Sequence, residues 1–166
     1  MSDSNLNNNP QTPWFEEIPL PALLRHSRAA YGAAMRKALA EAGYDDIPGN
    51  GLYLIGGLAL NRDDIPLSQL IKELRVSKQA AGQLVDTLVN RGYLNRQIDK
   101  EDRRKLTIQL TERGRAAAEV QRAAREKVDG ELLGCVGQED ISRTRRTLAV
   151  LANMGAQIRG EPDDEP

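Results

Sequence analysis

The sequence predicts a mainly α-helical fold that carries one small antiparallel sheet of two or three strands. Apolar residues recur with the helical period over most of the chain, and the period changes to two only between Leu94 and Leu110. The length of 166 residues and the hydrophobic content of 40% are those of one compact domain. The longest apolar run, Gly51 to Leu60, is about half the length that crosses a bilayer, so we expect no membrane span.

The two ends of the chain are expected to be mobile and to carry no chemistry. Residues 1–15 form a disordered, Asn- and Pro-rich tail, and residues 159–166 form an acidic tail. The start MSDSNLNNNPQTP lacks the basic and apolar parts of a secretory signal, so we expect a cytoplasmic protein. The single His and the single Cys are too few for a structural zinc site, and we expect no cofactor.

The first half of the chain predicts two helices and a turn. Leu20 to Ala42 has apolar residues at helical spacing opposite basic ones, which indicates a long amphipathic helix that ends at Gly43. Leu52 to Leu60 has little polar surface and predicts a second helix buried nearly all round, although the Gly56-Gly57 pair lowers its helix propensity. Residues 61–66 predict a polar turn.

The next segment predicts two helices separated by a tight turn. Ser68 caps a short first helix, and Ser77 begins the second. Gly92 suits the left-handed position that ends the second helix, where Tyr93 is expected to pack back on Leu88. One stripe of this helix is apolar (Ala81, Leu84, Val85, Leu88), and the opposite face carries Lys78, Gln79, Gly82, Gln83, Asp86 and Asn90.

The polar face of this second helix has two interpretations. It is either an ordinary solvated face or a surface that enters the major groove of DNA, where a Gln side chain matches the donor and acceptor of adenine. The local distribution of charge favours the interpretation that this face enters the major groove. Residues 72–115 hold eleven Lys and Arg against six Asp and Glu, whereas the net charge of the whole chain is −1.

Two strands follow, from Leu94 to Ile98 and from Leu106 to Leu110, joined by seven charged residues in succession. This loop is too polar to bury, so it is either a solvated turn or a wing whose Arg104 enters a minor groove. Asp102 lies two positions earlier in an extended segment and would orient the Arg104 guanidinium by a charge-assisted hydrogen bond.

In this order, VSKQAAGQLVDTLVNRGYL, DKEDRRK and LTIQLTERGR resemble the winged helix-turn-helix of the MarR family of bacterial transcription regulators. The resemblance covers roughly residues 20–158 and is most specific in RGYL, ED-RR and LT-x-x-G. It implies a homodimer whose two lobes bind a palindromic operator in double-stranded DNA, commonly as a repressor released by a small molecule or an oxidant. It also implies that Ser77 to Asn90 is the recognition helix, that Asp102 and Arg104 are the wing-tip pair, and that Thr111 starts the long helix leaving the lobe.

The resemblance divides the chain into a winged helix-turn-helix DNA-binding lobe, residues 48–111, and a helical dimerisation region, residues 20–45 and 112–158. The helices of this region carry apolar stripes that one chain cannot easily cover, so we expect them to pack on a second copy. Gln79 and Gln83 are expected to read bases and Arg104 to lie in the minor groove. The full set of predicted DNA contacts is Ser68, Ser77, Lys78, Gln79, Gln83, Asp86, Asn90, Arg91, Arg96, Asp102, Arg103, Arg104 and Lys105.

An effector pocket lies between the lobe and the dimer helices in similar regulators. Arg25, His26 and Tyr31 are the polar or aromatic candidates for its wall here, and the identity of a small-molecule effector is open. Cys135 lies between two predicted helices, near Glu131 and Glu139 rather than near Lys or Arg, so we expect an inert thiol.

Enzyme function is disfavoured because the chain has no H-E-x-x-H, no G-x-S-x-G and no phosphate-binding glycine loop. The acidic pairs Asp45-Asp46 and Asp63-Asp64 are expected to be solvated turn carboxylates. A further alternative is a winged-helix module that binds protein instead of DNA. It would keep the fold and the dimer but would have no affinity for a duplex.

Overall fold

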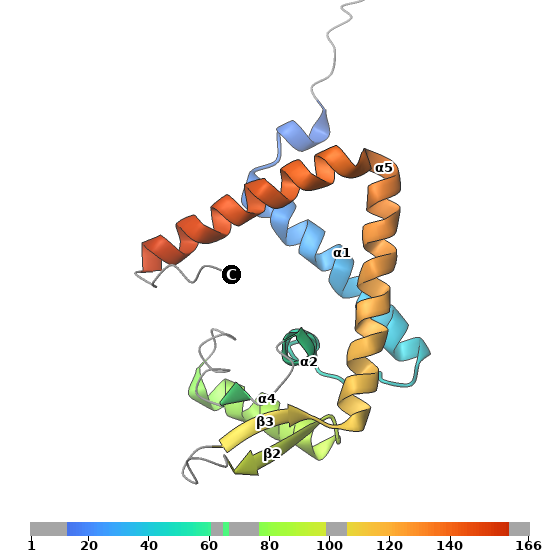
Figure 1. Ribbon diagram of the computed structural model, residues 1–166, viewed down its shortest axis with the longest axis vertical. Helices are drawn as coiled ribbons and strands as arrows, with labels where there is room; N and C mark the ends of the chain where they lie inside the picture. Colours follow the sequence, from blue (N-terminus) through green and yellow to red (C-terminus); the bar gives the residue numbers. More distant parts are fainter. Residues whose placement is uncertain (1–12, 61–64, 67–76, 99–105, 160–166) are drawn as a thin grey trace, which may run out of the picture.

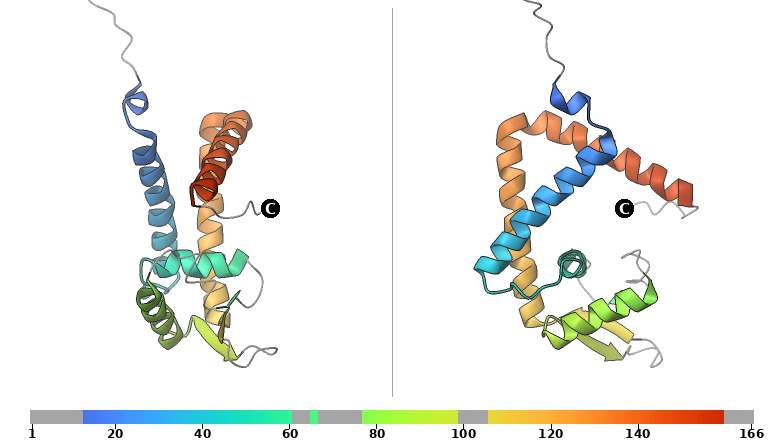
Figure 2. Two further views of the ribbon diagram at one scale, coloured as in Figure 1. Left: turned by 90° about the vertical axis from the view of Figure 1, so that its left-hand side faces the viewer. Right: turned by 180° about the vertical axis from the view of Figure 1, so that it is seen from behind.

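The computed structural model describes residues 13–60, 65–66, 77–98 and 106–159, and it shows a small lobe carried by two long helices (Figure 1). The long helices are α1 (Leu20–Glu41) and α5 (Glu112–Arg159), which pack against each other. The helix α2 (Gly51–Leu60) crosses beside α5, between α1 and the lobe (Figure 2). The lobe contains α4 (Lys78–Asn90) and the strands β1 (Ile65–Pro66), β2 (Leu94–Ile98) and β3 (Leu106–Leu110). The predicted mainly α-helical class with a small antiparallel sheet is confirmed.

The helix α1 occupies nearly the predicted range. Its last turn closes at Ala42, and Gly43, with φ of 81°, lets the Tyr44 amide donate to the Leu39 carbonyl at 2.8 Å. Before α1, Trp14 to Glu16 forms a short 3-10 helix, η1, and Pro19 precedes the first residue of α1. The disordered tail predicted for residues 1–15 is therefore wrong for Trp14 and Phe15, and residues 1–12 lie outside the described residues.

The helix α5 consists of two helical parts joined by a sharp bend at Gly137 (Figures 1 and 2). Gly137 has φ of 79° and ψ of 167°, outside the helical region, so the chain changes direction there. The sequence predicted that Cys135 lies between two helices, whereas in the structure Cys135 is an exposed residue of the helix and the break comes two residues later.

The sheet has the order β1-β3-β2, and both pairings are antiparallel. Leu94 lies opposite Leu110 and Arg96 lies opposite Ile108 in the β2–β3 hairpin. Ile65 pairs with Ile108 from the other side of β3, so the polar turn predicted for residues 61–66 is wrong for its last two residues. Residues 61–64 lie outside the described residues.

The core lies where α2, α4 and the β2–β3 hairpin meet the first turns of α5. Its largest fully buried side chains include Leu52, Ile55, Leu88, Tyr93 and Ile108. Most of α2 is buried, as its apolar composition predicted, and Tyr53 lies partly exposed on its outer side. Within the described ranges, no helix combines the length and apolar character that crossing a membrane requires.

Candidate functional site

The helix α4 presents one buried stripe and one exposed polar stripe. Ser77 caps its first turn, since the Ser77 Oγ accepts a hydrogen bond from the Ala80 amide at 3.1 Å. Ala81, Val85 and Leu88 are completely buried against the lobe. The exposed side chains of the opposite stripe are those of Gln79, Gln83, Asp86 and Asn90, which follow one another at helical spacing.

Two arginines near this polar stripe, Arg91 and Arg96, are held by protein contacts. Arg96 on β2 donates a hydrogen bond to the Asp86 carboxylate of α4, and the two form an exposed ion pair. Arg91, which follows α4, donates to the backbone carbonyl of Asp46. Lys78 is exposed in the first turn of α4. The structure therefore brings Asp86 and Arg96 together, and it fixes Arg91 at the opposite end of the helix.

The rest of the predicted DNA surface lies outside the described residues. This applies to Ser68 of the first predicted helix and to the wing residues Asp102, Arg103, Arg104 and Lys105. The strands β2 and β3 on either side of this wing have the predicted ranges.

A glycine and a tyrosine end α4 in a Schellman motif. The Tyr93 amide donates to the Leu88 carbonyl at 2.9 Å, and the Gly92 amide donates to the Val89 carbonyl at 2.9 Å. Gly92 has φ of 75°, which a residue with a side chain adopts only at a cost. Tyr93 and Leu88 lie in the same buried cluster, as predicted.

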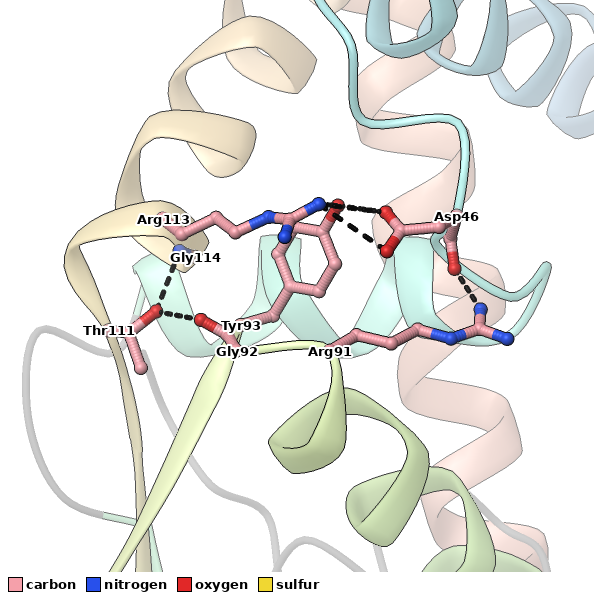
Figure 3. Close-up of polar contacts among 7 residues, drawn as sticks. All are labelled: Asp46, Arg91, Gly92, Tyr93, Thr111, Arg113 and Gly114. Carbon is pink, nitrogen blue, oxygen red and sulfur yellow. Dashed lines mark hydrogen bonds and ion pairs between the residues drawn. The ribbon is translucent and has the colours of Figure 1, made fainter.

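The start of α5 is built directly onto this motif (Figure 3). The Thr111 hydroxyl donates to the Gly92 carbonyl at 2.6 Å and accepts from the Gly114 amide at 3.0 Å, so Thr111 caps α5 and joins it to the end of α4. A Cβ on Gly114 would lie 2.1 Å from the Tyr93 carbonyl oxygen. The motifs RGYL and LT-x-x-G are thus the two halves of one contact, and Thr111 starts the long helix as predicted.

Asp46 ties the loop between α1 and α2 to this junction (Figure 3). The Tyr93 hydroxyl donates to the Asp46 Oδ1, and the Arg113 Nη2 lies 3.1 Å and 3.3 Å from the two Asp46 carboxylate oxygens. Arg113 also donates to the Tyr93 hydroxyl at 3.0 Å. The prediction that Asp46 is a solvated turn carboxylate is therefore wrong, because its partners lie 47 and 67 residues away in the chain.

The packing of this junction raises the pKa of Tyr93. Burial of the ring, followed by the hydrogen bond to Asp46, raises the pKa of Tyr93 from 10.0 to about 12. The hydrogen bond from Arg113 opposes part of this shift in pKa, and the Arg113 guanidinium carbon lies 4.5 Å from the centre of the ring.

A cleft of about 500 Å3 opens between α1, α2 and α5. Its walls include Leu24, Tyr31, Met35, Leu52 and Leu60. Of the three predicted effector residues, Tyr31 lines this cleft, whereas Arg25 and His26 are exposed on α1 and do not. The Tyr31 hydroxyl donates to Asp129 of α5, and this hydrogen bond raises the pKa of Tyr31.

Two polar residues of α5 line this cleft but were not predicted from the sequence. Gln121 is completely buried, and among the residues that the structure describes neither its Nε2 nor its Oε1 has a hydrogen-bond partner. Arg125 lies one turn further on and is half-buried. One signal in the sequence could have identified Gln121. It is an uncharged polar residue on a helix face that is otherwise apolar, with Ala117, Ala118 and Ala124. Within the described part of the chain, no three His, Cys, Asp or Glu side chains gather to hold a metal ion.

Comparison with known proteins relates the lobe to a family and the whole fold to solved structures. The model of the MarR family matches residues 46–105. The structure of S. aureus MepR in a DNA-binding conformation has a TM-score of 0.68 at 17% identity, covering 82% of this chain and 98% of that one. A MarR transcriptional regulator from Methanosarcina mazei Go1 has a TM-score of 0.68 at 20% identity, with coverages of 83% and 96%. NadR in complex with 4-hydroxyphenylacetate has a TM-score of 0.65 at 20% identity, with coverages of 81% and 93%. These likenesses show a shared fold, and no curated protein matches the sequence.

Proposed function

We propose that this chain is a transcription regulator of the MarR family, whose model matches residues 46–105, and that it is a repressor that occupies a palindromic operator as a homodimer. Members of this family regulate transcription and are not enzymes. The observation that carries the proposal is the exposed polar stripe of α4, which is held outward by the burial of the opposite stripe. Such a helix can enter a major groove without disturbing the core of the lobe.

The proposed contacts of α4 divide into base contacts and phosphate contacts. Gln79 and Gln83 are one turn apart in its N-terminal half, and each amide can pair with the edge of an adenine. Asp86 and Asn90 extend the same stripe toward further bases. The proposed phosphate contacts are Ser77, Lys78, Arg91 and Arg96.

The remaining contacts come from the resemblance to the family. Arg104 would lie in the minor groove beside the recognition helix, where the narrow groove attracts a guanidinium, and Asp102 would orient it. Arg103 would accompany Arg104 in the minor groove, and Lys105 and Ser68 would complete the contacts with DNA.

A second copy is proposed to cover the apolar face of α5. Large apolar side chains are exposed along this helix on both sides of the bend at Gly137: Leu132, Leu133, Val136, Leu148, Val150, Leu151, Met154 and Ile158. A surface of this extent is typical of an interface. A twofold pairing would present the two α4 helices to successive major grooves, about 34 Å apart on one side of the duplex.

The cleft between α1, α2 and α5 is proposed as the effector site. Its volume of about 500 Å3 suits a small organic molecule. A ligand there would touch α1 and α5 of the dimerisation region together with α2, which packs on β3 of the lobe. Binding would thus change the spacing of the two lobes and release the operator.

The test is selection of genomic fragments on the purified protein, followed by binding measurements on the selected site and on random duplexes. We expect Gln79→Ala to lose roughly 1–3 kcal/mol on the selected site and little on random DNA. We expect Arg104→Ala to lose much of the operator affinity while the dimer stays intact. Gln138→Ala removes a matched, exposed amide from α5 and should change neither affinity. Failure to bind any duplex at low ionic strength would instead support a protein-binding module.

A further inference from the structure

We propose that the effector cleft takes a flat heteroaromatic ligand with a lactam edge, and that Gln121 of α5 reads this edge. The inference rests on the proposed function, since it names the ligand class of the site assigned there. Its test below uses no DNA, so it stands or falls separately from operator binding.

Gln121 is the unexplained polar group of the core. Its relative exposure is 0%, and both polar atoms of its amide lack a hydrogen-bond partner within the described ranges of the chain. Folded proteins leave few buried polar groups without a partner, because each has lost its hydrogen bonds to water. Gln121 also belongs to the wall of the cleft between α1, α2 and α5, so a ligand bound in this cleft is the partner that we assign to its amide.

Gly56 of α2 packs closely against this amide. A Cβ on Gly56 would lie 3.2 Å from the Gln121 Oε1 and 3.3 Å from the Arg125 Nη1. A side chain at position 56 would therefore crowd both polar groups. A Cβ on Gly57 would have no atom within 4 Å, so the close approach is specific to Gly56.

The chemistry of an amide selects the ligand edge. A carboxylate offers only acceptors, so it can satisfy the Gln121 Nε2 but leaves the Oε1 unpaired. A lactam places an N–H donor beside a C=O acceptor and satisfies both atoms, as adenine does for a Gln side chain in a DNA groove. Arg125 supplies further donors for a second acceptor on the ligand, and it has no ion pair among the residues that the structure describes.

Two other polar groups of the cleft make contacts within the chain. The Arg28 guanidinium carbon lies 4.2 Å from the centre of the Tyr53 ring, and the Tyr31 hydroxyl is bound to Asp129. The remaining wall is apolar, which suits the faces of an aromatic ring system. We assign the lactam edge to Gln121 because its amide is the buried polar group of this wall, and Arg125 lies beside it.

Three matched probes test the ligand class on the full chain. 2-Quinolone carries the lactam edge, N-methyl-2-quinolone keeps the carbonyl but has no N–H, and 2-naphthoate has a similar ring system with an anionic acceptor. We expect calorimetry and thermal shift to show binding of 2-quinolone, with the other two at least about tenfold weaker, because each leaves the Gln121 Oε1 unpaired. Tighter binding of 2-naphthoate, or no binding of 2-quinolone, would overturn the proposal.

The variant Gln121→Met tests the residue separately from the ligand. Met is unbranched and of similar size, and it removes both unpaired polar atoms from the core. We expect the Tm of the free protein to rise and the affinity for 2-quinolone to fall at least about tenfold. The exposed control Gln138→Met should change neither. A lower Tm with unchanged affinity would make Gln121 a packing residue and would overturn the proposal.

Discussion

At the level of single residues, the contact of Gly114 with Tyr93 leaves the least tolerance for substitution. A Cβ on Gly114 would lie 2.1 Å from a backbone carbonyl oxygen and 3.0 Å from the Leu110 Cδ2, so α5 would have to move away from the end of α4. We expect Gly114→Ala to lower the free energy of unfolding in urea by about 3 kcal/mol or more.

The matched control for this change is Gly130→Ala, in the same helix but with no atom within 4 Å of the added Cβ. Its higher helix propensity should stabilise the protein by up to about 1 kcal/mol. Equal effects of the two substitutions would show that the close approach of Gly114 is unimportant.

The raised pKa of Tyr93 predicts that the free energy of unfolding decreases at alkaline pH. Its pKa is 10.0 in the unfolded chain and about 12 in the folded protein, where burial and the hydrogen bond to Asp46 favour the neutral phenol. A raised pKa gives stability that is complete below pH 10 and is lost as the pH rises from about 10 to about 12. We expect Tyr93→Phe to be less stable than wild type at neutral pH and to lose less stability over this range. Denaturant titrations at several pH values measure the difference, and parallel curves would refute it.

At the level of elements, the features that the sequence predicted are those set by neighbours in the chain. The cap of Ser77, the left-handed Gly92 and the stripe of Val85 and Leu88 all depend on residues within one or two helical turns. The strand of Ile65 could not be predicted in this way, since two residues ending in a proline resemble a turn until Ile108 of β3 pairs with them.

The polar contacts that the sequence did not predict join distant segments. Asp46 lies in a loop and looks solvated, because nothing in its vicinity shows that Tyr93 and Arg113 will reach it. The burial of Gln121 without a partner depends on the packing of α2 against α5, which no pattern within α5 alone reveals. Site residues could therefore be predicted from the sequence when they all lie on one helix. They could not be predicted when the site is formed by three elements that are distant in the chain.

The pair of Asp86 and Arg96, which links α4 to β2, gives a prediction at this level. Their side chains are 54% and 36% exposed, so we expect either alanine variant to change stability by less than about 1 kcal/mol. We expect Arg96→Ala to weaken operator and random DNA equally and to reduce the salt slope by about one, as loss of a phosphate contact does. Asp86→Ala should instead reduce the discrimination between the two DNAs.

Fluorescence anisotropy at several salt concentrations measures both effects. Lys37→Ala is the control, since it removes an exposed cation that lies 4.0 Å from Glu41 on α1, away from α4. An unchanged salt slope for Arg96→Ala would remove Arg96 from the phosphate contacts.

At the level of the whole molecule, the apolar face of α5 determines whether two lobes act together. Leu148 and Leu151 are 40% and 41% exposed, and Ile158 continues their stripe at helical spacing with 83% exposed. We expect Leu151→Asp to yield a monomer at micromolar concentration in sedimentation equilibrium, because a second copy would have to bury the new charge. The fold within one chain should persist by circular dichroism, since α1 and α2 both pack against α5 of the same chain.

The loss of the second copy should also weaken operator binding. Two linked lobes gain affinity because the second binds at a high effective concentration, so we expect a loss of about a hundredfold or more on the palindromic site. A half-site should bind the variant and the wild type with similar affinity. Ala40→Asp adds the same charge to an exposed position of α1 and should leave both the dimer and the affinity unchanged. A wild-type protein that sediments as a monomer would contradict this account of α5.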